Sequence, residues 1–472
     1  MPYSITKTTL PCLTFIFGLA LAGCHDTDCF YNADNPEACG FASLDENQSM
    51  TTNLQWDEIS TTGVCDACTT PGEKSEEEDD CYAVESLAMC EAESVPRGLY
   101  VLVKWDKEAR LDKRLLDLPF ISGATVRAYW KDIEYAPGRY DWSKLDAHFA
   151  WASDAGKGVR LAIGTGVYAP DWLLRSTGNA DTRCASNDTI ATSAFGVQTF
   201  CASVRNGEYK TQRRSFPVAW DAVMYARWRM FLEALVAHLE TSDASRSAAI
   251  DILDWIAVTG PGSHNGEVLH PDADYLNLPL RHPVSHGPIN TADDLLEALG
   301  FSWQRALDDF DGLFGARRIH HTLSFVFKSF PLGNGNQEHD ALFKQDLLDY
   351  GRALPHAPYF GLQTNGLDDR ALWVSEENWP LAKEHWKLVR NHTTPGQSFT
   401  GLQSRGMGRL YGDGDKSSCG RGEVWKKLLS NAKCLQVDVV EVYAPDVLAP
   451  FDESCGGGVR AQLQELHAWL TQ

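Results

Sequence analysis

Short apolar runs alternate with amphipathic stretches along most of the chain, starting near Pro96. Eight runs have the length and apolar content of buried strands: Leu99–Trp105, Ala124–Ala128, Val159–Ile163, Ile252–Val258, His320–Val326, Tyr359–Leu362, Ser398–Leu402 and Val437–Val442. Helical patterns lie between them, among them Trp220–Leu239, Ala292–Leu299 and Gly457–Leu470. Strands that alternate with helices predict a parallel α/β sheet, and eight repeats predict closure into a (β/α)8 TIM barrel over residues 96–472.

A long insert, from about Tyr168 to Phe216, separates the third predicted strand from its helix. It carries Cys184 and Cys201. Because it follows the carboxyl end of a strand, we expect it on the face where barrels build their active sites.

The first 23 residues have the pattern of an export signal. Lys7 precedes an apolar run from Leu10 to Ala22, which is too short for a membrane span. The ending Leu21-Ala22-Gly23-Cys24 resembles a bacterial lipobox, which implies cleavage before Cys24 and lipidation of its thiol. His25 stands where inner-membrane lipoproteins carry aspartate, so the resemblance implies an outer-membrane address in the cell envelope. The alternative is an ordinary secretory signal with a chance cysteine.

Residues 24–95 differ in composition from the rest of the chain. They hold six cysteines beyond Cys24 and the acidic run Glu73–Asp80, which predicts a solvated tether with a small disulfide-stapled module. Cys65-x-x-Cys68 is a weak zinc or redox signal, because no second such pair or histidine pair lies nearby. Disulfides are the expected use of these cysteines in an oxidising compartment. We therefore predict no metal and no cofactor.

The formal net charge of −22 argues against nucleic acid as a partner, because phosphates demand a basic face. It also disfavours long-range steering of an acidic polysaccharide, although a local basic pocket could override this.

The segment from Gly123 to Trp172 carries the most specific motif. Trp130 is followed by Ile133-Glu134 and then by Pro137-Gly-Arg-Tyr-Asp-Trp-Ser-Lys-Leu-Asp146. Over about fifty residues this resembles the second β/α unit of clan A glycoside hydrolases, such as the β-galactosidase-like barrels. The resemblance implies a carbohydrate substrate and two catalytic carboxyl groups, one after the fourth strand and one at the end of the seventh.

By this resemblance the acid/base residue is Glu267, which ends the Gly-rich loop after the fourth strand. The family usually has asparagine directly before this glutamate, whereas Gly266 stands here. The alternative role is that of a surface glutamate that caps the next helix.

The expected nucleophile position falls at Gln403, which has no negative charge. Gln363 occupies a similar place on the sixth strand, so both glutamines are expected to line the pocket. Glu441 on the eighth strand is the substitute carboxylate, either catalytic or in a structural ion pair with Arg127. Four loop acids are further candidates: Asp368, Glu376, Glu377 and Asp446.

Arg127 matches an arginine that orders the nucleophile region in the family. Several aromatic residues at strand ends or in loops could stack on sugar rings, although any single one of them is more often a core residue: Trp130, Tyr168, Trp172, Trp373, Trp379 and Tyr443. His264 could bind a hydroxyl group or tune Glu267. Two functions follow: a lipid-anchored hydrolase of a neutral glycan, or a catalytically inactive surface protein that binds glycans.

Overall fold

The computed structural model describes most of the chain from residue 95 onward. The described residues are 95–103, 113–176, 178, 181–185, 189–204, 209, 211–244, 247–262, 267–271, 273–326, 329–332, 337–367, 388–389, 392, 399–404, 428–433, 435–444, 447 and 459–472. The predicted lipoprotein signal, Cys24 and the cysteine-rich tether lie outside them. Within these ranges, no helix has both the length and the apolar character needed to cross a bilayer.

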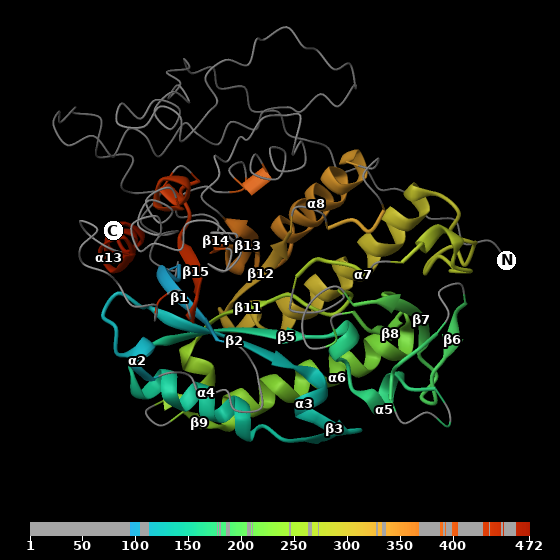
Figure 1. Ribbon diagram of the computed structural model, residues 1–472, viewed down its shortest axis with the longest axis horizontal. Helices are drawn as coiled ribbons and strands as arrows, with labels where there is room; N and C mark the ends of the chain where they lie inside the picture. Colours follow the sequence, from blue (N-terminus) through green and yellow to red (C-terminus); the bar gives the residue numbers. More distant parts are fainter. Residues whose placement is uncertain are drawn as a thin grey trace, which may run out of the picture.

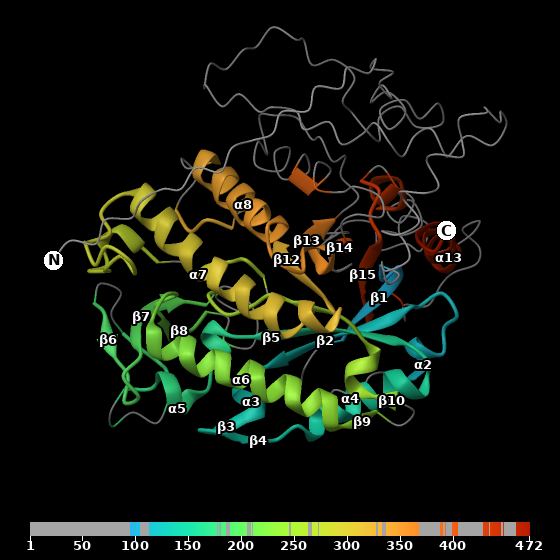
Figure 2. The ribbon, with the colours of Figure 1, turned by 180° about the vertical axis from the view of Figure 1, so that it is seen from behind.

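Eight parallel strands close into a barrel, which confirms the predicted fold (Figures 1 and 2). They are β1 (Gly98–Val103), β2 (Gly123–Tyr129), β5 (Gly158–Gly164), β11 (Leu253–Ala257), β12 (His320–Phe325), β13 (Phe360–Leu367), β14 (Phe399–Ser404) and β15 (Val439–Tyr443). Each overlaps one of the eight apolar runs. The first strand pairs with both the second and the last, so the sheet has no free edge.

Helices surround the barrel: α2 (Lys113–Leu116), α3 (Trp130–Ile133), α4 (Ser143–Asp154), α5 (Asp171–Leu174), α6 (Ala222–Thr241), α7 (Ala292–Leu313), α8 (Gln337–Arg352) and α13 (Val459–Leu470). The longest of them, α7, begins with a capping box in which Thr291 and Asp294 satisfy each other's backbone N–H groups. It runs fourteen residues beyond the end of the predicted helix Ala292–Leu299 because its apolar positions continue to Leu307 and Phe310, both buried.

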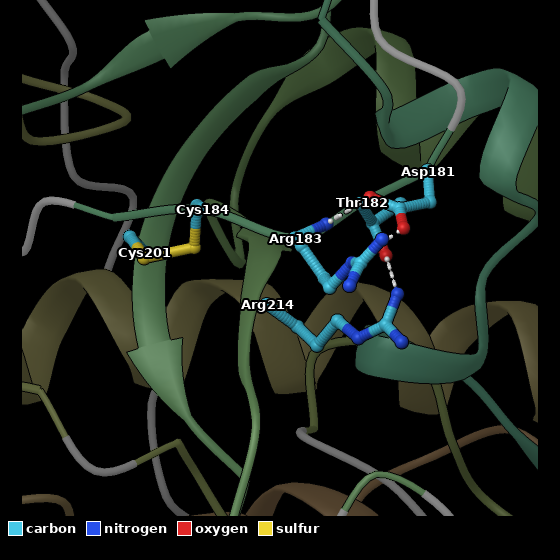
Figure 3. The surroundings of a disulfide bond; sticks show 6 residues. All are labelled: Asp181, Thr182, Arg183, Cys184, Cys201 and Arg214. Atoms are coloured by element: carbon cyan, nitrogen blue, oxygen red, sulfur yellow. Dashed lines mark hydrogen bonds and ion pairs between the residues drawn. A yellow bond between two sulfur atoms is a disulfide. The ribbon is translucent and has the colours of Figure 1, made fainter.

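The insert after β5 folds into its own three-stranded antiparallel sheet, β6 (Ala191–Thr192), β7 (Gln198–Ser203) and β8 (Arg213–Pro217). A disulfide joins Cys184 to Cys201 on β7, in agreement with the expected use of cysteines as disulfides (Figure 3). The sheet lies on the side toward which β2 and β5 point (Figure 1). It therefore stands beside the carboxyl ends of the barrel strands.

The amino-terminal end of the barrel interior is filled by aromatic rings. Tyr100 and Phe399 both pack edge-on against Trp255, with ring centroids 4.3 Å and 5.1 Å away. Gly123 makes room for Tyr100, since a Cβ at this position would lie 2.2 Å from the tyrosine ring. This layer closes the amino-terminal end of the barrel. The polar side chains of the interior lie between this layer and the carboxyl-terminal end.

A buried carboxyl group beside this layer should make stability depend on pH. The hydroxyl of Tyr100 donates to Asp254 Oδ2 at 2.5 Å, and burial raises the pKa of Asp254 to about 6. The folded state therefore binds a proton on the Asp254 carboxyl group more tightly than the unfolded chain does. The stability contributed by the protonated group is present below about pH 4 and is lost as pH rises toward 6.

We expect Asp254→Asn to remove this loss of stability, which is about 3 kcal/mol, and to make the protein more stable than wild type at pH 7. Urea unfolding at several pH values between 4 and 7.5 measures it, with the exposed Asp251→Asn as the control. Parallel pH profiles for wild type and Asp254→Asn would refute the prediction.

Candidate active site

Glu267 lies at the carboxyl end of the barrel, as its position after the fourth strand predicts. The next residue, Val268, forms a parallel bridge with Phe325 at the end of β12, and its N–H donates to the Ser324 carbonyl at 2.7 Å. The chain thus returns from the loop to the barrel rim at this residue. The Glu267 side chain is 13% exposed, so a ligand above the rim can reach it.

Two side chains from other strands hold this carboxylate. Asn365 on β13 donates from Nδ2 to Glu267 Oε1 at 2.7 Å, and Arg127 Nη2 on β2 lies 3.7 Å from the same oxygen. Burial alone would lower the pKa of Arg127, but Glu267, Tyr443 and Glu441 together bring it above its ordinary value. Arg127 is therefore a permanent cation at the barrel mouth.

The second predicted carboxylate, Glu441, lies inside the barrel and is 1% exposed. Its ion-pair partner is Arg160 on β5, with Nη1 2.8 Å from Oε2. The side chain of Gln363 also donates to Oε2, and Gln403 donates to Oε1 at 3.2 Å. Three donors therefore occupy both carboxylate oxygens.

The expected Arg127–Glu441 pair is thus replaced by two other pairs. Arg127 faces Glu267 near the end of β2, whereas Arg160 faces Glu441. The stagger of the closed sheet decides this pairing, because it sets which positions on different strands share a level of the interior. Burial lowers the pKa of Arg160, although Glu441 opposes this effect.

Both glutamines predicted to line the pocket belong to the buried layer around Glu441. Gln363 and Gln403 are 2% and 3% exposed. Gln403 lies on the seventh barrel strand, directly opposite Glu441 in the register of β14 and β15. Their contact with a substrate remains a prediction, whereas their contact with Glu441 is observed.

Arg127 and Arg160 both interact electrostatically with Glu267 and Glu441, so the four side chains form one group. Glu267 is its accessible acid, and Glu441 is its enclosed one. The Glu267 side chain is partly exposed at the barrel mouth, whereas Glu441 is buried in its ion pair with Arg160.

Three predicted aromatic platforms are packing residues in this structure. Trp130 is fully buried and packs on Trp228, and its Nε1 donates to Glu134 Oε2 at 2.7 Å. Trp172 donates to the Glu134 carbonyl at 3.1 Å and is 8% exposed. Tyr168 is fully buried and stacks on Tyr129 at 3.8 Å. Trp130 and Tyr168 thus expose no surface to a sugar, because Trp130 packs on α6 and Tyr168 packs on the end of β2.

Tyr443, at the end of β15, is half-buried and close enough to Arg127 to influence the pKa of that residue. It remains a candidate contact for a ligand. The other sequence candidates lie outside the described residues: His264, Asp368, Trp373, Glu376, Glu377, Trp379 and Asp446.

Sequence reasoning missed two residues of the site. Asn365 and Arg160 both follow the two-residue alternation of inward positions on their strands, with Asn365 two places after Gln363. That alternation was a signal available in the sequence. Among the described residues, no group of three or more His, Cys, Asp or Glu side chains could hold a metal ion.

Fold and site define a (β/α)8 barrel with an accessible carboxylate at its carboxyl-terminal mouth. No protein-family model and no curated protein matches the sequence. Among solved structures, the chain is similar to the catalytic domain of β-amylase from Paenibacillus polymyxa, with a TM-score of 0.47 and 10% identity over 79% of this chain and 98% of that one.

Two further structures show the same kind of distant similarity. Xylanase B from Clostridium stercorarium matches with a TM-score of 0.40 and 10% identity over 74% of this chain and 86% of that one. A D-psicose 3-epimerase solved in the presence of D-fructose matches with a TM-score of 0.34 and 12% identity over 79% and 96%. At this level of identity, the similarity concerns the fold alone.

Proposed function

We propose that the protein is an exported, lipid-anchored glycoside hydrolase that cleaves O-glycosidic bonds of a neutral glycan. The observation that carries the proposal is the Glu267 carboxylate, which is partly exposed at the barrel mouth and held by Asn365 and Arg127. Barrel enzymes place their chemistry at this end of the strands. The clan A motif around Trp130 supports the same reaction class.

Glu267 is assigned the role of general acid and base. Asn365 and Arg127 both engage Oε1, and no described residue donates to Oε2. In its protonated form, Glu267 gives its proton to the glycosidic oxygen as the C–O bond breaks, and it then accepts a proton from the attacking water. Because Asn365 and Arg127 engage Oε1, Oε2 is the oxygen assigned to act on the substrate.

Glu441 is the second carboxylate of the proposal. Its three donors stabilise the ionised form, which is the form required beneath an oxocarbenium-like transition state. The loop acids Asp368, Glu376 and Glu377 are the alternatives for this role.

Hydrolysis is tested by incubating the purified protein with a panel of aryl glycosides and neutral polysaccharides and measuring released aglycone and reducing ends. Turnover on at least one linkage supports the proposal. No release from any member of a panel that covers the common hexose and pentose linkages would contradict it.

One observation favours a second function, a surface protein that binds glycans without cleaving them. Gln403 stands on the strand where the family carries its nucleophile, and Glu441 has both oxygens engaged. A barrel of this kind can keep a sugar site without its chemistry, because function resides in the site and not in the fold. Glycan-array binding without turnover would support this function, and hydrolysis by contaminant-free protein would exclude it.

The lipid anchor is tested at Cys24. Acyl chains contribute about 0.8 kcal/mol per buried methylene, so a multiply acylated protein should partition into the detergent phase of Triton X-114 and label with a fatty acid. Cys24→Ser should abolish the label and move the protein to the aqueous phase. A Cys24→Ser protein that still fractionates with membranes would show that the lipobox interpretation is wrong.

A further inference from the structure

Tyr129 is a half-buried aromatic residue at the mouth of the barrel. It ends β2, two positions after Arg127. The inward side of this strand is marked by Gly123, where a Cβ would lie 2.2 Å from the Tyr100 ring in the aromatic layer of the interior. Side chains alternate between the two faces of a strand, so Tyr129 faces the interior together with Arg127.

This position places Tyr129 on the solvent side of the Arg127–Glu267 ion pair. Two residues of a strand span about 6.6 Å, so the tyrosine lies that far beyond Arg127 toward the carboxyl-terminal opening. It is still close enough to help raise the pKa of Arg127. A ligand that reaches Glu267 from above the rim therefore passes beside the Tyr129 ring.

A second tyrosine covers one face of this ring. Tyr168 is fully buried and stacks on Tyr129 with ring centroids 3.8 Å apart and an interplanar angle of 11°. Gly164 pairs with Tyr129 in the register of β2 and β5 and makes room for both rings, since a Cβ there would lie 3.0 Å from Tyr129 and 3.2 Å from Tyr168. The accessible surface of Tyr129 is therefore on the side away from Tyr168.

The insert supports this stack from behind. The Tyr209 ring lies 5.8 Å from the Tyr168 ring, and Lys131 Nζ donates to the Tyr209 hydroxyl at 2.5 Å. The guanidinium of Arg214 on β8 lies 4.1 Å from the centre of the Tyr209 ring. Contacts thus continue from the insert sheet to Tyr129 and hold its ring in one orientation. A pre-oriented ring loses little conformational entropy when a ligand binds.

We propose that Tyr129 is a substrate-binding platform next to Glu267, on which a sugar ring of the glycan stacks. The accessible side of an aromatic ring matches the apolar C–H face of a pyranose, and aromatic side chains are common in small-ligand sites. The inference rests on the proposed carbohydrate function and narrows it, because the sugar unit beside Glu267 must present an uncharged C–H face. Tyr168 and Gly164 act as positioning residues, since they set the plane of the platform.

The test measures dissociation constants by calorimetry on the full chain, with Glu267→Gln as a second background in which hydrolysis is suppressed. The probes are α-1,4-linked glucose and β-1,4-linked glucose, xylose and mannose oligosaccharides of two to six units. Tyr129→Leu should weaken binding of the best ligand about tenfold, whereas Tyr129→Phe keeps the ring and should stay within about twofold. Gly164→Ala displaces the ring without removing it and should weaken binding about threefold.

Tyr135→Leu is the matched control. Tyr135 belongs to the same sequence motif, lies on β3 (Glu134–Ala136) and is 55% exposed. Its substitution removes an accessible tyrosine away from the proposed platform, so every dissociation constant should stay at the wild-type value. A thermal unfolding curve for each variant verifies that it is folded.

Steady-state kinetics separate a platform from a structural cover over the Arg127–Glu267 pair. A platform binds substrate and transition state alike, so Tyr129→Leu in the otherwise wild-type chain should raise KM and leave kcat and its pH profile unchanged. Loss of a cover would instead admit water to the ion pair. It would shift the pH profile of kcat at constant KM, and that result would overturn the platform.

The platform is also overturned if Tyr129→Leu binds like wild type or if Tyr135→Leu loses as much affinity. Should Tyr129→Leu not fold, Gly164→Ala decides alone, and wild-type affinity in that variant is the contrary result. If no probe binds the wild-type chain, the carbohydrate function fails and the platform with it. Turnover with unaltered Tyr129→Leu binding would sink only the platform, whereas binding that Tyr129→Leu weakens, without turnover, would support the platform and remove only the hydrolase.

Discussion

Glu267→Gln is expected to lower the hydrolytic rate by about 10²- to 10⁴-fold, the usual contribution of a general acid or base. Glutamine has the size of glutamate and keeps an oxygen for the Asn365 donor, so the fold should persist. It cannot exchange the proton that the leaving group needs. The measurement is kcat on the best substrate of the screen, together with a thermal unfolding curve for each preparation.

A matched control is available in Glu240→Gln, which removes a glutamate that also pairs with an arginine but lies on the surface. It should have wild-type activity. Substrates with good leaving groups need less proton donation, so aryl glycosides with acidic phenols should lose less rate than natural linkages do. Wild-type turnover by Glu267→Gln would remove Glu267 from the mechanism.

Glu441→Gln is expected to destabilise the protein by about 3–5 kcal/mol, because it leaves the Arg160 guanidinium buried without a countercharge. Arg160 and Glu441 are 2% and 1% exposed, so water cannot replace the lost partner. Urea unfolding measures the loss of stability, and an activity assay on the same preparation measures the catalytic rate separately.

The double variant Arg160→Met/Glu441→Leu distinguishes a buried charge from a general loss of packing. Removing both charges should restore much of the stability lost in Glu441→Gln, since a well-packed apolar pair often replaces a buried ion pair without cost. A Glu441→Gln protein with wild-type stability but no turnover would instead identify Glu441 as a catalytic carboxylate. A stable and fully active variant would contradict both roles and direct attention to Asp368, Glu376 and Glu377.

The sequence predicted the barrel well because each strand is a short apolar run between polar, helix-forming stretches. Those runs arise from burial on both faces of the sheet, so they are visible without any knowledge of neighbours. For the aromatic residue Trp130 of the motif after β2, the sequence left two roles open, contact with a sugar or packing in the core, and the structure shows the second. Whether Trp130 meets a ligand or Trp228 depends on a helix more than ninety residues away in the sequence.

The ion pairs could not be assigned in the same way. Arg127 and Arg160 both face the barrel interior. The sequence of neither strand shows which carboxylate lies at the same height in the barrel as its arginine. That choice depends on the register of the closed sheet, which sums small offsets over eight strand pairs. Inward alternation identifies the polar residues of the interior, whereas only the assembled barrel identifies their partners.

Closure of the barrel through β1 and β15 has a consequence for how the chain is made. More than 300 residues separate these two neighbours, so at 5–20 residues per second the ribosome needs roughly 15 to 70 s between them. Through that interval the outer edge of β1 offers unpaired backbone groups to any other nascent strand. Pairing on this edge of β1 is therefore completed only after the last strand of the barrel is available.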